Sequence, residues 1–379
     1  MRRALVPIAV ILAVPLVLWA GCAVYGVDLL VAGDGGGADA GAGADGDAGP
    51  QGCAHAGPPA RPDGDDPGGV DTEVVAAITL VDFGLDAGAS RSFDLDDTCT
   101  CPGPESCKPL AGSKHCDDDA GRDNAGGPLL AKFAALSSTF DPNGVNARIG
   151  EGQNTLIVRV RRWNGLPNDT SVELDVFVSS GTAPQDDAGH GPPPKHDGTD
   201  VWAVDSASLV GGIAPPYVPT FVDENAYVSG GMVVATLDFP LSLGGGYAAA
   251  FISLSGARVV GVLEDRATGH AIKDARVVGR WGSRNLLTSL QVAGDPFNKG
   301  QYLCGSDLTY QTLKSEICKA ADLATNAQND NSGAACDAMS LVLSFQSEPA
   351  TLGPATTATG VDGGAVAPCG ASYTDQCGL

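Results

Sequence analysis

The stretch that decides the fold is NTLIVRVRRWNGLPNDTSVELDVFVSSG, residues 154–181. Apolar residues alternate with Arg159 and Arg161 in its first arm, and with Glu173 and Asp175 in its second arm. A turn rich in Gly, Pro, Asn and Asp separates the two arms. Period-two alternation on both sides of such a turn predicts an antiparallel strand pair with one buried and one solvated face. The two arginines are then expected to face the two acids across the pair.

Further runs of the same kind follow along the chain. Strands are expected within residues 72–83, 200–204, 230–243, 247–265, 275–282 and 336–345, and helices within residues 128–140, 284–294 and 306–324. Many short strands with Gly-rich turns and few helices indicate a mainly β protein. We expect an antiparallel β-sandwich of jelly-roll type with a few helices packed against it.

Composition divides the chain into four parts. Residues 1–21 have the pattern of a signal peptide, and residues 22–70 form a linker rich in Asp, Gly and Ala. Residues 71–353 form the β-sandwich domain with a cysteine-rich knuckle at 99–116, and residues 354–379 form a C-terminal tail. Because the linker cannot bury enough apolar surface to offset the entropy of ordering, we expect a disordered acidic tether.

The leader ends in a motif that suggests an anchor. Arg2 and Arg3 precede an apolar run that leads to Ala20, Gly21 and Cys22. This arrangement resembles the lipobox of bacterial lipoproteins, which implies that the Cys22 sulfur is acylated and that the leader is removed before it. Two other interpretations stay open: an uncleaved transmembrane helix over the apolar run, or ordinary cleavage further along, after Gly26. All three export the chain.

The cysteines that remain after Cys22 are even in number. They are Cys53, Cys99, Cys101, Cys107, Cys116, Cys304, Cys318, Cys336, Cys369 and Cys377. An even set in an exported protein predicts disulfides and no free thiol. The four cysteines of the knuckle are expected to form two local disulfides, with their pairing left open, and Cys369 is expected to pair with Cys377 within the tail. The spacing inside the knuckle is not one that zinc sites use.

The acidic run CDDDAGRDNAGG, residues 116–127, is the strongest candidate site. Asp117, Asp119 and Asp123 offer carboxylate oxygens, and Asn124 offers a carbonyl oxygen. Calcium prefers six to eight such oxygens, so the run is a candidate calcium site. The alternative is a solvated loop in which Asp123 or Asn124 caps the helix that follows.

The net charge of −23 makes the chain a poor partner for nucleic acid. The expected partner is the membrane, reached through the lipid anchor, and a carbohydrate or an envelope protein is the expected kind of ligand.

Several features together resemble predicted lipoproteins of myxobacterial type. They are the lipobox-like leader, the Asp/Gly linker, GRDNAGG before a helix, CDAMSLVLSF after a cysteine-bearing helix, and the ending TDQCGL. The resemblance implies a bacterial envelope location, at the outer membrane or the cell surface. It implies no chemistry, because these predicted lipoproteins have no established activity.

The motifs of metalloproteases, α/β-hydrolases and P-loop enzymes are missing from the sequence, and no catalytic residue can be assigned. We therefore expect a non-enzymatic binding or structural module, and the alternative is an exported hydrolase that acts on polysaccharide. Exposure of Trp163, Trp202 or Trp281 on a concave sheet would favour glycan binding. A cleft with two carboxylates about 5–10 Å apart would favour the hydrolase.

Overall fold

The fold is that of a computed structural model. It describes residues 53–64, 71–84, 91–101, 103–110, 113–136, 141–185, 191–243, 250–291, 293–295, 298, 301–305, 307–357, 369 and 375–378. The expected signal peptide, Cys22 and most of the expected linker lie outside these residues. Among the described residues, no helix has the length and apolar character needed to cross a lipid bilayer.

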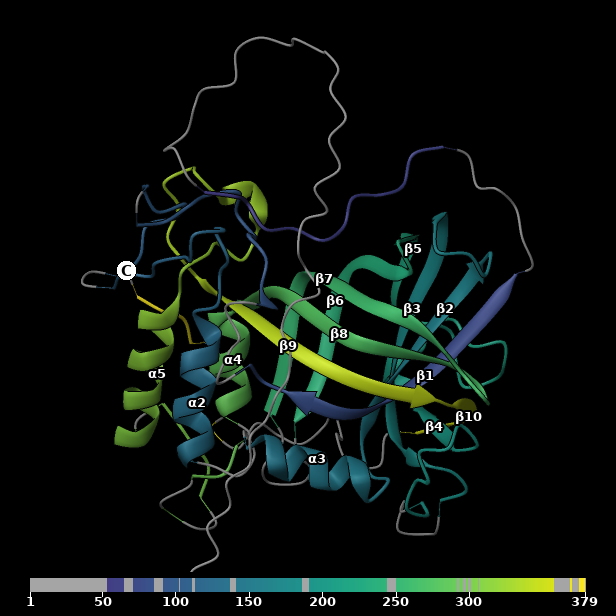
Figure 1. The fold of residues 1–379 in the computed structure, drawn as a ribbon. Helices are drawn as coiled ribbons and strands as arrows, with labels where there is room; N and C mark the ends of the chain where they lie inside the picture. The colour runs from purple at the N-terminus through teal and green to yellow at the C-terminus, as the bar shows by residue number, and fades with distance from the viewer. Residues whose placement is uncertain are drawn as a thin grey trace, which may run out of the picture. The chain divides into compact units, whose positions relative to one another are not determined.

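Eight antiparallel strands close into a barrel (Figure 1). They are β1 (Thr72–Asp82), β2 (Thr155–Trp163), β3 (Asp169–Thr182), β5 (Phe221–Ser229), β6 (Met232–Leu243), β7 (Ala250–Arg266), β8 (Gly269–Gly282) and β9 (Ala338–Pro349). The sheet order runs β3-β2-β1-β9-β8-β7-β6-β5, and β5 pairs again with β3. The mainly β, antiparallel prediction is confirmed, but the expected jelly-roll sandwich is replaced by a closed barrel. The reason is that β3 carries partners on both edges, β2 and β5, so the sheet has no break at which two layers would separate.

Strands β2 and β3 form the expected hairpin, with the expected register. Arg159 lies opposite Asp175, and Arg161 lies opposite Glu173. The apolar residues that alternate with them point into the barrel core. Local period-two patterning was therefore sufficient to predict this pair of strands.

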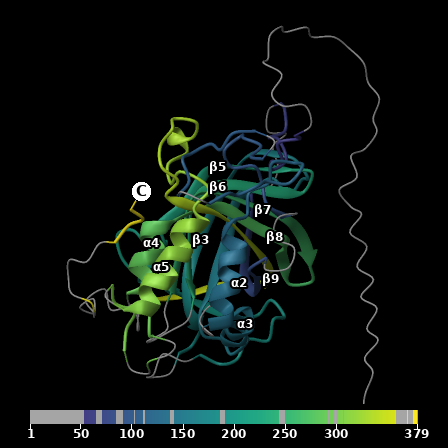
Figure 2. The ribbon, with the colours of Figure 1, turned by 90° about the vertical axis from the view of Figure 1, so that its left-hand side faces the viewer.

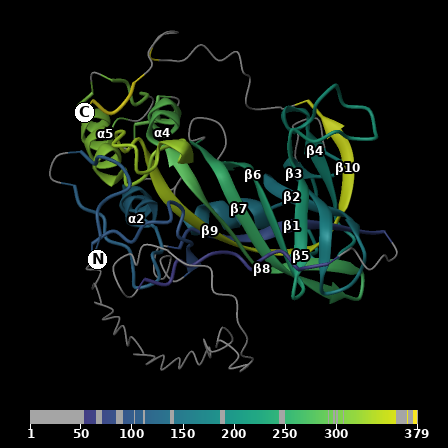
Figure 3. The same ribbon diagram turned by 90° about the horizontal axis from the view of Figure 1, so that it is seen from above.

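The outer face of this hairpin is covered, not solvated as expected. Strands β4 (Val201–Asp205) and β10 (Thr351–Thr356) continue the sheet beside β3, as Figure 3 shows. Ile157, Phe177 and Trp202 pack together in a second apolar cluster on this outer face. As a consequence, Arg159 is only 8% exposed and Asp175 is 0% exposed.

The interior of the barrel is filled by side chains. Large apolar residues from the strands meet there, among them Phe239, Ile272 and Phe345. The cavity between them has a volume of about 20 Å³. A volume of that size admits about one water molecule, so the described interior is a packed core.

Helices cover the barrel at one side. Figure 2 shows α2 (Gly126–Leu136), α4 (Ser283–Leu290) and α5 (Leu308–Ala320) next to one another, and all three were expected from the sequence. A fourth helix, α3 (Pro142–Gly150), packs against β1 and was not expected. Asp141 caps it by accepting a hydrogen bond from Asn143 N, and Pro142 occupies its first turn.

A third layer, which we call the cap, covers the outer face of β6–β9. It consists of residues 53–64, 91–101, 103–110, 113–125 and 321–337. Phe93 and Leu95 of the cap pack on Val260 and Val278 of the barrel. The sequence assigned residues 53–64 to the linker. In the structure, Asp94 N donates a hydrogen bond to Ala56 O (2.8 Å), so this segment contacts the rest of the cap.

Candidate metal centre

Three disulfides hold the cap together. They join Cys53 to Cys99, Cys101 to Cys116, and Cys107 to Cys336. The expectation of two local disulfides within the knuckle is wrong, since only the second of these pairs is local. The other two knuckle cysteines pair with segments that the fold brings from both sides of the chain.

The C-terminal tail is also fastened differently from the prediction. Cys304 pairs with Cys369, and Cys318 of α5 pairs with Cys377. A tail closed on itself by Cys369 and Cys377 is therefore wrong. The structure pairs all ten cysteines after Cys22, and each pair of the tail ties it to the folded body.

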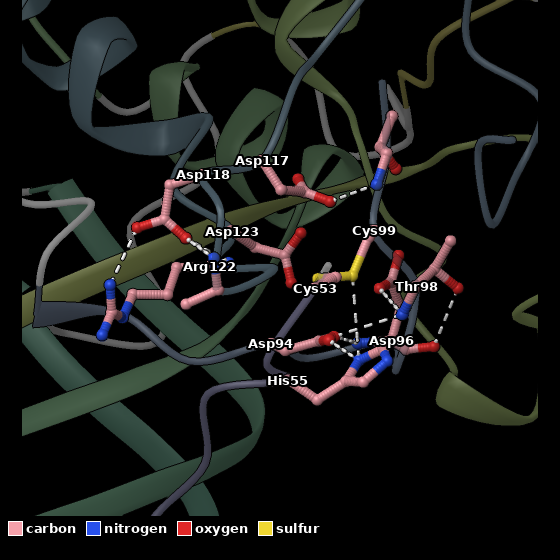
Figure 4. Close-up of a disulfide and its surroundings, with 12 residues drawn as sticks. Cys53, His55, Asp94, Asp96, Thr98, Cys99, Asp117, Asp118, Arg122 and Asp123 are labelled. Carbon is pink, nitrogen blue, oxygen red and sulfur yellow. Dashed lines mark hydrogen bonds and ion pairs between the residues drawn. A yellow bond between two sulfur atoms is a disulfide. The ribbon is translucent and has the colours of Figure 1, made fainter. Parts of the chain in front are cut away.

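Within the cap, carboxyl groups from separate segments meet, as Figure 4 shows. One oxygen of each of Asp94, Asp96 and Asp123 lies within 4.8 Å of one oxygen of the other two. These three residues are 1%, 6% and 4% exposed. Asp117 and Asp322 lie close enough to raise the pKa of Asp123. We call the five residues the acidic cluster.

Backbone groups orient the carboxyls of the acidic cluster. Leu95 N donates to Asp123 Oδ2 (2.7 Å), Thr98 N donates to Asp96 Oδ1 (3.0 Å), and Thr100 N donates to Asp117 Oδ2 (2.6 Å). These donors belong to residues 95–100, next to the disulfide at Cys99. The short loop is thereby held in one conformation around the carboxyl groups.

Asp322 of the acidic cluster is hydrogen-bonded to a strand of the barrel. Asp322 accepts hydrogen bonds from the backbone N (2.8 Å) and from Oγ (2.5 Å) of Ser340, which lies on β9. Burial raises the pKa of Asp322. Asp322, which follows α5 in the chain, is therefore fixed against the outer face of the sheet that the cap covers.

Asp96, Asp117 and Asp123 of the acidic cluster have raised pKa values. Burial, together with the neighbouring carboxylates, raises the pKa of Asp123 to about 10. Burial is also the main cause that raises the pKa of Asp96 to about 7, although the Ser106 hydroxyl acts to lower it. Burial likewise raises the pKa of Asp117 to about 6. Such groups favour either bound protons or a bound cation, because ionised carboxylates at this spacing repel one another.

Positive charge around the cluster is sparse. His55 Nδ1 lies 2.5 Å from Asp94 Oδ2, and this hydrogen bond is the main cause that raises the pKa of His55. Arg258 donates to the backbone oxygen of Asp94, and Arg280 donates to that of Leu95. Among the described residues, no Lys or Arg side chain forms an ion pair with a carboxyl of the acidic cluster.

The expected calcium ligands divide into two groups. Asp117 and Asp123 belong to the acidic cluster, whereas Asp119 is exposed on the turn between them. Asn124 lies against Gly127 at the start of α2 and is not among the three grouped carboxyls. The sequence analysis missed Asp94, Asp96 and Asp322, although the alternating acids in FDLDD, residues 93–97, are a local signal for the first two.

A neighbouring group of possible ligand atoms, Cys53, His55 and Cys99, has a different character. Its two sulfur atoms are joined in a disulfide, so neither is the thiolate that soft metals require. The oxygen-only acidic cluster is therefore the arrangement in the cap that fits a cation, and it suits a hard one.

No family model, curated protein or solved structure matches this chain.

Proposed function

We propose that this chain is an exported lipoprotein of the bacterial envelope, anchored at the outer membrane or cell surface through Cys22. Its barrel domain acts there as a non-enzymatic binding or structural module. The observation that supports export best is the set of five disulfides, which links residues up to 229 positions apart. Disulfides of this density persist in oxidising compartments and are rare in the cytosol.

The packed interior of the barrel supports a module that binds its ligand on its outer surface. Among the described residues, the cavity inside the barrel has a volume of about 20 Å³, and a carbohydrate or a peptide does not fit into it. Trp163, Trp202 and Trp281 are all buried, and none provides the exposed aromatic platform that would favour glycan binding. An envelope protein is therefore the better supported ligand.

The alternative of a polysaccharide hydrolase finds no specific support in the described residues. Its two carboxyls would have to contact a polymer in an open cleft. The carboxyls of Asp94, Asp96 and Asp123, which are grouped within the cap, are almost completely buried.

The anchor is tested by expressing the complete chain and its Cys22→Ser variant in a Gram-negative host. We expect the original chain to fractionate with membranes and the variant to be lost from them, because the variant lacks the acylated sulfur. Ala23→Ser is the matched control and should leave fractionation unchanged. Mass spectrometry of the mature amino terminus then identifies the modification.

Two outcomes would contradict the anchor. An unmodified amino terminus just after Gly26 would indicate ordinary cleavage and a released protein. Retention of the Cys22→Ser variant with its leader intact would indicate a transmembrane segment instead.

A further inference from the structure

The distances within the acidic cluster suit a single ion. One oxygen each from Asp94, Asp96 and Asp123 lies within 4.8 Å of the others. Calcium binds oxygens at about 2.3–2.6 Å, so two ligands on opposite sides of one ion are up to about 5 Å apart. All three carboxyls can therefore reach the same calcium ion without leaving the positions they have.

The carboxyls also keep oxygens for a ligand. The backbone bonds from Thr98 and Leu95 use one oxygen of Asp96 and one oxygen of Asp123. Each carboxyl has a second oxygen, and the loop that positions it is closed by the disulfide at Cys99. The backbone contacts therefore leave one oxygen of Asp96 and one oxygen of Asp123 for a ligand. Asp94 differs, because its Oδ1 accepts from Asp96 N and Thr98 N and its Oδ2 lies against His55 Nδ1.

A buried hydroxyl supplies an independent indication of a missing partner. Ser106 is 2% exposed, and its Oγ makes no hydrogen bond of normal geometry with any described residue. The same hydroxyl faces the Asp96 carboxyl. A buried polar atom without a well-formed hydrogen bond destabilises the fold, and a cation between Ser106 and the carboxyls would give this oxygen a partner.

The small number of positive charges that pair with the acidic cluster also favours a bound cation. Asp94 is paired with His55, but the described Lys and Arg side chains make no ion pair with Asp96, Asp117 or Asp123. The guanidinium groups of Arg258 and Arg280 donate to backbone oxygens of the loop. Arg280 is moreover already paired with Asp330.

We propose that Asp94, Asp96 and Asp123 bind one calcium ion within the cap, with Ser106 Oγ and Asp117 as further oxygen donors. This set retains Asp117 and Asp123 from the sequence motif and replaces Asp119 and Asn124. Magnesium is disfavoured, since it requires near-octahedral oxygens at about 2.0–2.1 Å and gives up its water reluctantly. The proposal does not depend on the lipid anchor.

The experiment is thermal unfolding of the purified, oxidised chain in calcium chloride and in chelator, at matched ionic strength. Calcium should raise the midpoint by a few degrees at saturation, with a dissociation constant of ~10⁻⁴–10⁻³ M, as at other extracellular sites. Magnesium chloride at the same concentration should give a clearly smaller shift. Matched ionic strength matters because a net charge of −23 responds to any salt.

Three variants separate binding from folding. The double variant Asp96→Asn, Asp123→Asn should lose the calcium shift, yet in chelator its midpoint should stay close to that of the original chain, because each amide replaces a carboxyl group of similar size whose charged form is already disfavoured there. Ser106→Ala should weaken calcium binding several-fold. Asp119→Asn, which changes an exposed acid of the same loop, should keep the full shift.

Several results would overturn the proposal. One is an equal midpoint in calcium and chelator for the original chain. Another is an undiminished calcium shift in the double variant, and a third is an equal response to magnesium and calcium. Loss of the shift in Asp119→Asn alone would return the site to the exposed loop.

Discussion

At the scale of single residues, Gly121 determines how closely the cap can pack. Its φ of +68° lies in the left-handed region, and a Cβ at this position would be 2.7 Å from Asp94 Oδ2 and 3.1 Å from Cys53 Sγ. Only glycine avoids both the strain and the overlap. The turn therefore joins the acidic cluster to the Cys53–Cys99 disulfide through one residue without a side chain.

Gly121→Ala should destabilise the protein by at least about 1–2 kcal/mol, because the left-handed conformation alone has that cost for a residue with a Cβ. Urea unfolding measures the difference. Gly57→Ala is the matched control, since Gly57 lies in the same cap and has open space around its Cα. A Gly121→Ala variant as stable as the Gly57→Ala variant would contradict this role for Gly121.

At the scale of elements, the strands beside the β2–β3 hairpin determine which of its side chains are exposed. Arg159 and Asp175 form an ion pair of 2.5 Å that the adjoining strands cover. The sequence predicted their register and expected a weak, solvated pair. Burial changes the energetics, because removing one partner would leave the other charge uncompensated in the interior.

A second contact between elements is that of the C-terminal tail with α5. Asp375 accepts hydrogen bonds from Tyr310 Oη (2.9 Å) and from Lys314 Nζ (2.5 Å), close to the Cys318–Cys377 disulfide. Partial burial opposes ionisation of Asp375, but the bonds from Lys314 and Tyr310 outweigh it, and the pKa of Asp375 is lowered. The tail is thus held by charge as well as by covalent bonds.

Asp375→Asn should cost roughly 1.5–3 kcal/mol of stability at pH 7, the usual range for hydrogen bonds to a charged group. Since the folded pKa lies below the unfolded value of about 3.9, this contribution is present above that pH. It should disappear as the pH falls through the folded pKa. Thermal midpoints of the original chain and the variant between neutral and acid pH measure it.

The control for this titration is Asp63→Asn, which changes an exposed carboxyl of the cap. It should run parallel to the original chain at every pH. A difference between the original chain and Asp375→Asn that persists unchanged into acid would argue against an ionised Asp375.

At the scale of the whole molecule, the disulfides join segments that lie far apart in the chain. Cys107 and Cys336 are 229 residues apart and join two segments of the cap, whereas Cys101 and Cys116 are 15 residues apart. In the chain-entropy account, the longer loop restricts the unfolded state more. The long-range pair should therefore contribute more to the stability of the cap on the barrel.

Replacing Cys107 and Cys336 by alanine should destabilise the protein by about 5 kcal/mol, against about 3 kcal/mol for Cys101 and Cys116. Urea unfolding of the two double variants compares the values directly. Alkylation of the unreduced, denatured parent protein is the accompanying control and should label no cysteine after Cys22. Equal losses in the two variants would indicate that strain or local structure, not loop closure, decides the effect.

The sequence by itself determined most of the strands, three of the helices, the register of the β2–β3 hairpin and the paired state of the cysteines. These features depend on residues close together in the chain, where alternation, turn chemistry and cysteine number act directly. It also pointed to Asp117 and Asp123, because they share one acidic run.

Tertiary structure alone decided the rest. The closure of β5 on β3, the partners of each cysteine and the cover over Arg159 all join segments from distant parts of the chain. The acidic cluster likewise combines Asp94 and Asp96 with Asp123 and Asp322. Contacts of this kind depend on loop closure and on packing against the entire barrel, and no local pattern records which of the many alternatives buries the most apolar surface.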